Sequence, residues 1–274
     1  MQGPEQATFS PLNLWRNPST YVTGAALLGV AGIAWVGLVL QTTGMQRDTT
    51  GADTSLSLSG AALFIAAWGV MMAAMMLPSA TPMIVMYRKI RSGLSPDDRH
   101  VIPTAFFAAI YLAIWLSLGL IVYVGGFALR ALADANPVVS EWFPYAVAAI
   151  FVATGAYQFT SLKQACLRNC RTPLSFLMAR WRSNYAGTFK LAAAHAAYCV
   201  GCCAALMVVL VAAGAMSLPW VLLIAAIVFL EKILPRGDRI ARIVGAAFVV
   251  LGLAVVIDPE LAAVLRGTAM SSPM

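Results

Sequence analysis

The stretch LAAAHAAYCVGCCAALMVVLVAAGAM, residues 191–216, combines the two features that define this sequence. It is an apolar run long enough to cross a lipid bilayer as a helix, which takes about 20 residues. The same run carries a histidine, His195, and three thiols, Cys199, Cys202 and Cys203. Because polar and ionisable groups are costly inside a membrane, their presence in such a run indicates a functional site.

The composition extends the membrane interpretation to the whole chain. Of its 274 residues, 61% are hydrophobic and 11% are charged, whereas soluble domains carry about 25% charged residues. The alternating pattern of a membrane β-barrel is absent. We therefore predict an all-α fold, a polytopic bundle of about seven transmembrane helices that uses the lipid bilayer as its surroundings.

Seven segments have the length and hydropathy of a spanning helix. They are Tyr21–Leu40, Leu58–Leu77, Ile102–Val124, Phe143–Leu162, Thr188–Ala213, Leu218–Leu234 and Ile243–Ile257. They divide the chain into an N-terminal segment (1–20), a helical membrane domain (21–257) and a C-terminal tail (258–274).

The distribution of positive charge predicts the orientation. Fifteen of the eighteen lysine and arginine residues precede the first segment or follow the second, fourth and sixth. Since such residues are enriched in cytoplasmic loops, we predict a cytoplasmic N-terminus and an external C-terminus. The net charge of +7 reflects these loops, and no basic run is interleaved with aromatic residues as in a nucleic-acid-binding protein.

The histidine and the three thiols of the opening stretch share one helix face. His195, Cys199, Cys202 and Cys203 stand at positions i, i+4, i+7 and i+8. Thiolates are soft ligands for Cu(I), zinc or iron–sulfur clusters, and imidazole suits zinc and copper. A single cysteine here would be a packing residue. The group of four favours a metal site.

A methionine stripe in the second segment selects among these metals. Met72, Met75 and Met76 stand at i, i+3 and i+4, just before Pro78. The second and fifth segments run in opposite directions, which places this stripe at about the depth of His195. Thioethers suit Cu(I) and bind zinc poorly, so we predict Cu(I), with zinc the less favoured metal. The alternative is that these flexible side chains only fill gaps between helices.

Two further thiols, Cys166 and Cys170, fall after the fourth segment, one helical turn apart. Their cationic neighbours Lys163, Arg168 and Arg171 favour the thiolate form, and a structural disulfide is not expected in the cytoplasm. We interpret the pair as an entry site that passes metal to the helix face of His195, Cys199, Cys202 and Cys203. The alternative is that Cys166 and Cys170 are incidental surface thiols. Glu231 is interpreted as an interfacial charge.

Four motifs together resemble a bacterial family of predicted metal-binding integral membrane proteins, often labelled copper chaperones. In order they are MMAAMMLPSATPM (71–83), GAYQFTSLKQACLRNCRTPLSFL (155–177), HAAYCVGCCAALM (195–207) and the EK-L-P pattern of Glu231–Pro235. The resemblance covers roughly Gly60 to Ala247. It implies a multi-pass protein of the bacterial cytoplasmic (inner) membrane. The matching positions are Met75, Met76, Pro78, Cys166, Cys170, Arg171, Pro173, His195, Cys199, Cys202 and Cys203.

The leading hypothesis is a non-enzymatic membrane protein that binds Cu(I) and handles it or delivers it to a membrane-associated copper enzyme. Its partners would be a copper-donor or copper-acceptor protein. One alternative is a thiol–disulfide electron carrier that uses Cys199 and Cys202, which would not need the methionines. The other is a channel or transporter in which the thiols only pack.

Overall fold

The computed structural model describes residues 18–45, 58–94, 101–214 and 217–265. These ranges contain ten α-helices and no strand, which confirms the all-α fold class. The helices are α1 (Pro18–Met45), α2 (Leu58–Leu94), α3 (Val101–Ala135), α4 (Pro137–Gln158), α5 (Ser161–Arg171), α6 (Pro173–Arg180), α7 (Tyr185–Ala212), α8 (Leu218–Ile233), α9 (Gly237–Ile257) and α10 (Glu260–Leu265).

Polar side chains start the helices around the opening stretch. The side chain of Thr160 accepts a hydrogen bond from the backbone N–H of Lys163 and begins α5. In the same way Asn184 accepts from the N–H of Gly187 and begins α7. Such caps satisfy backbone donors that have no partner inside the helix.

Five helices are long and apolar enough to cross a membrane: Thr20–Gln41, Leu58–Gly93, Ile102–Ala135, Tyr185–Ala212 and Gly237–Ile257. A sixth span results if Glu141–Gln158 and Ser161–Arg171 are taken together across their 63° bend. The long apolar helices indicate a multi-pass membrane protein, but the described residues do not supply the seven spans we predicted.

The difference in count has two structural causes. The expected helix Phe143–Leu162 breaks after Gln158, so that α5 leaves the direction of α4. The expected helix Leu218–Leu234 forms as α8, but its 16 residues rise only about 24 Å, less than the ~30 Å hydrocarbon core. Residues 1–17, on which the predicted side of the N-terminus depends, lie outside the described ranges.

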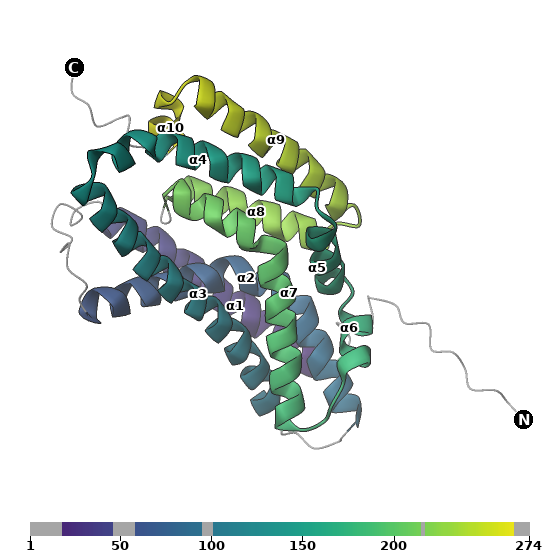
Figure 1. The fold of residues 1–274 in the computed structure, drawn as a ribbon. Coiled ribbons are helices and arrows are strands. Elements are labelled where there is room, and N and C mark those ends of the chain that lie inside the picture. The colour runs from purple at the N-terminus through teal and green to yellow at the C-terminus, as the bar shows by residue number, and fades with distance from the viewer. Residues whose placement is uncertain (1–17, 46–57, 95–100, 215–216, 266–274) are drawn as a thin grey trace, which may run out of the picture.

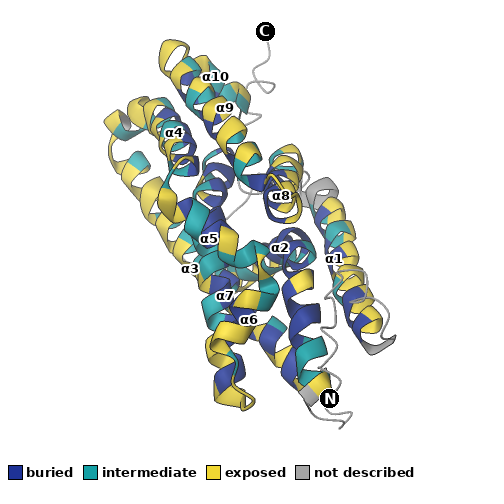
Figure 2. Cartoon of the chain, turned by 90° about the vertical axis from the view of Figure 1, so that its right-hand side faces the viewer, coloured by how far each residue is buried: buried dark blue, intermediate teal, exposed yellow. Residues whose placement is uncertain are grey.

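The helices form a bundle with the α4–α9 pair along its upper edge in Figure 1 and α1 at one edge in Figure 2. α1 packs against α2 and leaves most of its other face exposed, while α2 is largely buried (Figure 2). Gly155 of α4 and Gly245 of α9 let their helices touch, because a Cβ on Gly155 would lie 2.5 Å from the carbonyl oxygen of Gly245. Contacts through small residues are typical of membrane helix pairs.

α4 is also tied to α7, the helix that carries the thiols. The hydroxyl of Tyr157 donates to the carbonyl oxygen of Gly201 over 2.5 Å. One turn away, the hydroxyl of Thr154 donates to the carbonyl oxygen of Ala205 over 3.1 Å. These two bonds fix the middle of α7 against α4.

Candidate metal site

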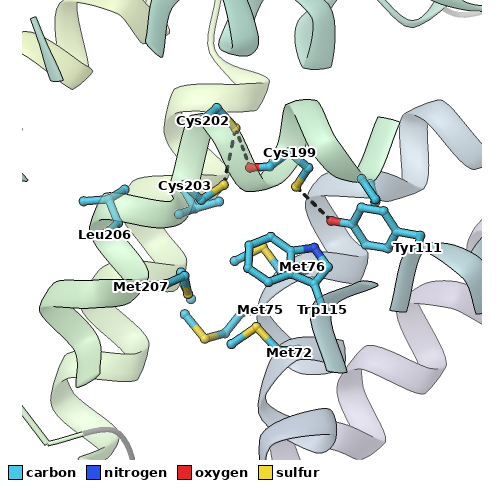
Figure 3. Packing of buried hydrophobic residues seen from close by; sticks show 14 of the residues in the cluster. Met72, Met75, Met76, Tyr111, Trp115, Cys199, Cys202, Cys203, Leu206 and Met207 are labelled. Atoms are coloured by element: carbon cyan, nitrogen blue, oxygen red, sulfur yellow. Dashed lines mark hydrogen bonds between the residues drawn. The ribbon is translucent and has the colours of Figure 1, made fainter. Parts of the chain in front are cut away.

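Three sulfurs of α7 form the centre of the site. The sulfur atoms of Cys199, Cys202 and Cys203 all lie within 4.8 Å of one another, and those of Cys202 and Cys203 are 3.3 Å apart. Each residue is at most 2% exposed, and none forms a disulfide. The helical spacing seen in the sequence therefore brings the three thiols to one point (Figure 3).

A fourth sulfur reaches this point from α5. The sulfur of Cys170 lies 3.9 Å from that of Cys202, and Cys170 is the one cysteine of the five that is partly exposed. Of the pair interpreted as an entry site, Cys170 thus lies directly beside the thiols of α7, and its part in metal entry stays a prediction. The bend after α4 folds α5 against α7, so that Cys170 lies next to the three cysteines of α7.

Gly201 allows this close approach of α5. A Cβ at this position would lie 2.7 Å from the sulfur of Cys166, closer than real side chains come. Cys166 itself is buried over the glycine. Its sulfur is not one of the three that lie mutually close, so Cys166 packs the two helices together.

The cations near the α5 thiols have other partners. Lys163, fully buried, forms an ion pair of 2.7 Å with Glu231 of α8, which is 2% exposed. Arg171 donates to the carbonyl oxygens of Leu234 and Pro235 over 2.7 and 2.5 Å. These side chains join α5 to the end of α8. Glu231, interpreted from the sequence as an interfacial charge, is thus buried in the protein and paired with Lys163.

The cation beside the thiols is one that the sequence reasoning missed. The ammonium group of Lys232 donates to the sulfur of Cys199 over 3.0 Å and to the hydroxyl of Ser79 over 3.1 Å. The Tyr111 hydroxyl lies 3.0 Å from the same sulfur. In surroundings of low polarity an ammonium at this distance strongly favours a negatively charged sulfur. The sequence did contain a signal for this cation, because Glu231 and Lys232 are adjacent charged residues inside the apolar segment Leu218–Leu234.

The methionines line the space beside the cysteines. Met72, Met75 and Met76 are 0%, 2% and 0% exposed, so their side chains face protein. Met72, Met75 and Met76 of α2 and Met207 of α7 belong to the same buried cluster as the three cysteines (Figure 3). Thioether groups thus adjoin the thiol cluster, and their part as ligands stays a prediction.

His195 lies apart from the three clustered sulfurs. It is 3% exposed, and neither ring nitrogen has a hydrogen-bond partner among the described residues. Its ring stacks on Tyr111, with centroids 5.4 Å apart, and lies 6.2 Å from the ring of Phe107 and 6.0 Å from that of Phe176. Because buried polar atoms almost always have partners, the imidazole is suited to bind a ligand.

Buried soft donors of this kind, held between apolar helices beside one ammonium group, form a cluster that could hold a soft metal ion. Comparison with known families agrees. The family model described as "PpoB2: Copper chaperone" matches residues 65–255, more than half of the chain, and the protein belongs to this family. This confirms the resemblance seen in the four motifs. No curated protein and no solved structure matches the chain.

Proposed function

We propose that the protein carries Cu(I) as cargo in the bacterial cytoplasmic membrane and hands it to a copper protein. The observation that carries this proposal is the set of three buried sulfurs, those of Cys199, Cys202 and Cys203, within 4.8 Å of one another. Thiolates in such an arrangement bind soft cations. The family to which the chain belongs is described as copper chaperones.

Cu(I) fits these donors better than zinc. With the sulfur of Cys170 the neighbouring thiols number four, a set that zinc also accepts. The thioethers, and not the number of thiols, therefore favour Cu(I). Met76 belongs to the same buried cluster as the three thiols, and its thioether is a soft donor suited to Cu(I). One positive charge from the metal and one from Lys232 also balance two thiolates, which limits the net charge buried in the bundle.

Delivery requires that the cargo can leave the cluster. The sulfur of Cys170 lies 3.9 Å from that of Cys202, and Cys170 is partly exposed. This position supports a role for Cys170 as the first sulfur to receive the copper ion or the last to hold it. Exchange between neighbouring thiolates moves a soft cation without releasing it to water. In this proposal the protein performs no catalysis, and its partners are a copper donor and an acceptor such as a membrane copper enzyme.

A copper titration of the purified, reduced protein tests the proposal. We expect about one to two Cu(I) per chain, because one thiol cluster with adjoining thioethers is available. The double substitution Cys199→Ser with Cys202→Ser should remove most of that copper. The matched control is Cys166→Ser, which removes a buried thiol outside the cluster. Equal copper content in the double variant and the unmodified chain contradicts the proposal.

The second candidate, a thiol–disulfide electron carrier, is favoured by the short sulfur–sulfur distances of 3.3 Å for Cys202–Cys203 and 3.9 Å for Cys170–Cys202. It predicts a disulfide that forms and breaks reversibly during turnover and no tight copper binding. Mass measurement of the oxidised chain, beside the copper titration, separates the two functions.

A further inference from the structure

A basic pocket lies where α6 turns into α7, away from the thiol cluster. It has a volume of about 460 Å³, and its lining includes three cationic side chains, Arg180, Arg182 and Lys190, together with Trp181. No acidic side chain lines it. Across the described ranges, no ion pair engages any of the three cations. Like charges gathered in this way repel one another, so an anion placed between them is stabilised.

The wall of the pocket depends on a glycine. Gly187 is buried under Arg182, and a Cβ on it would lie 2.8 Å from the carbonyl oxygen of Arg182 and would meet that residue's own Cβ. Asn184 accepts from the N–H of Gly187 over 2.8 Å and holds the turn against the first turn of α7. The pocket is thus formed by a fixed turn and not by side chains alone.

Two of the lining side chains are held in place. The guanidinium group of Arg180 lies 4.6 Å from the ring centre of Phe176 and donates to the hydroxyl of Tyr198 over 3.2 Å. Trp181 packs on Tyr87, with ring centroids 5.5 Å apart. A ligand that binds here meets a partly organised set of donors, which lowers the entropy lost on binding.

The surroundings of the pocket are apolar. Three large side chains close to it in sequence are exposed: Met178 by 63%, Tyr185 by 55% and Phe189 by 53%. The pocket lies at the start of the span Tyr185–Ala212, where a membrane helix would meet the headgroup region. A ligand that matches both features has a negative headgroup and an apolar chain.

We propose that this pocket binds the phosphate group of an anionic phospholipid, while the acyl chains lie along the exposed side chains of α6 and α7. Arg180, Arg182 and Lys190 contact the phosphate oxygens, and Trp181 lies at the level of the headgroup. Basic pockets at the membrane surface of helical proteins suit such headgroups. The inference does not depend on copper binding.

The test measures phospholipid binding to the full-length protein in detergent by native mass spectrometry, with phosphatidylglycerol as the anionic probe and phosphatidylcholine as the zwitterionic one. The double variant Arg182→Gln with Lys190→Gln removes two pocket charges and leaves the stacked Arg180 in place. The matched control is Arg239→Gln with Arg242→Gln, which removes two exposed charges of α9 outside the pocket. Thermal unfolding checks that each variant is folded.

We expect the pocket variant to bind phosphatidylglycerol roughly tenfold or more weakly, because each basic residue near an anionic headgroup adds to binding. The α9 variant should bind it as the unmodified chain does, and phosphatidylcholine should not compete. Equal binding by the pocket variant, or an equal loss in the α9 variant, overturns the proposal. So does inorganic phosphate that binds as tightly as the lipid, because the apolar part then contributes nothing.

A second measurement needs no substitution and covers the case of a variant that does not fold. A photoactivatable phosphatidylglycerol is cross-linked to the unmodified protein, and the labelled peptides are identified by mass. Labelling concentrated within residues 178–191 supports the pocket. Labelling spread evenly over the other exposed helices overturns it.

Discussion

The sulfur atoms of Cys170 and Cys202 lie 3.9 Å apart, although 32 residues separate them. Cys170 belongs to a short helix after a sharp bend, and Cys202 to the middle of a buried membrane-type helix. Their contact joins two thiol groups that the sequence presents as separate. A partly exposed thiol thus adjoins a cluster that is otherwise enclosed, which suits a carrier that must load and release its cargo.

The first prediction compares the two cysteines of α5. Cys170→Ser should slow loading of Cu(I) from a glutathione complex roughly tenfold, because the sulfur of a partly exposed residue next to the cluster is lost while the three sulfurs proposed to hold the metal remain. Cys166→Ser should leave the rate within about twofold, since its sulfur is not among the clustered ones. Stopped-flow measurement of copper uptake checks both rates. Equal rates in the two variants argue against a role for Cys170 in loading.

The second prediction concerns the glycine beneath Cys166. Gly201→Ala places a Cβ 2.7 Å from the sulfur of Cys166, and overpacking of this kind destabilises by about 1–3 kcal/mol. The added methyl group should also push α5 away and lower the copper affinity. Thermal unfolding and a competitive copper titration measure the two effects.

Removal of the opposing sulfur provides the control for this prediction. In the double variant Gly201→Ala with Cys166→Ala the clash is absent, so most of the lost stability and affinity should return. If the double variant is less stable than either single one, α5 is not held at the distance from α7 that the structure shows.

The composition and helical spacing predicted the fold class and the centre of the site because both depend on local pattern. The faces of α2 and α7 follow from the 3.6-residue repeat, and the repeat is enough to gather Cys199, Cys202 and Cys203. The failures are non-local. Thr160 is a local capping signal within the run Phe143–Leu162, but the 63° bend that sets the position of α5 cannot be read from the sequence pattern.

The charged residues show the same limit. Lys163 and Glu231 are 68 residues apart, and either one alone reads as an interfacial charge. Burying either charge alone would cost several kcal/mol, and the ion pair between them offsets that cost. The position of Lys232 beside the thiols likewise could not be predicted from α8 alone, because its partners Ser79 and Cys199 lie on two other helices.

The third prediction tests the ammonium group at the cluster. Lys232→Met keeps the length and apolar stem of the side chain and removes its charged donor to Cys199. Hydrogen bonds to charged groups contribute about 1.5–3 kcal/mol, so the Cu(I) affinity should fall roughly tenfold to a hundredfold. The matched control Lys190→Met removes an exposed ammonium of α7 and should leave the affinity unchanged. A competitive titration against a Cu(I) chelator measures it, and an unchanged affinity in Lys232→Met would show that the contact is only structural.

The fourth prediction separates packing from ligation in the methionine stripe. Met76→Leu conserves volume, and such core exchanges usually cost less than about 1.5 kcal/mol of stability. The substitution removes a thioether from the buried cluster that Met76 shares with Cys203, so Cu(I) binding should weaken while the unfolding temperature stays nearly constant. Met71→Leu, at an equally buried methionine of the same helix, is the control and should change neither. Parallel loss of stability and affinity would identify Met76 as a packing residue.

The last prediction concerns the buried ion pair between Lys163 and Glu231, whose charged atoms are 2.7 Å apart with side chains 0% and 2% exposed. Glu231→Gln leaves the ammonium of Lys163 buried without its partner, and breaking a buried pair in this way destabilises by about 3–5 kcal/mol. The double substitution Lys163→Met with Glu231→Leu removes both charges, so it should be far less destabilising than the single one. The comparison pair is Arg171 and Asp238, which are 4.0 Å apart and partly exposed, so Asp238→Asn should change stability by less than about 1 kcal/mol. Thermal unfolding in one detergent ranks the four proteins. A double variant as unstable as Glu231→Gln alone would mean that the two side chains act through packing, and that their charges do not hold α5 against α8.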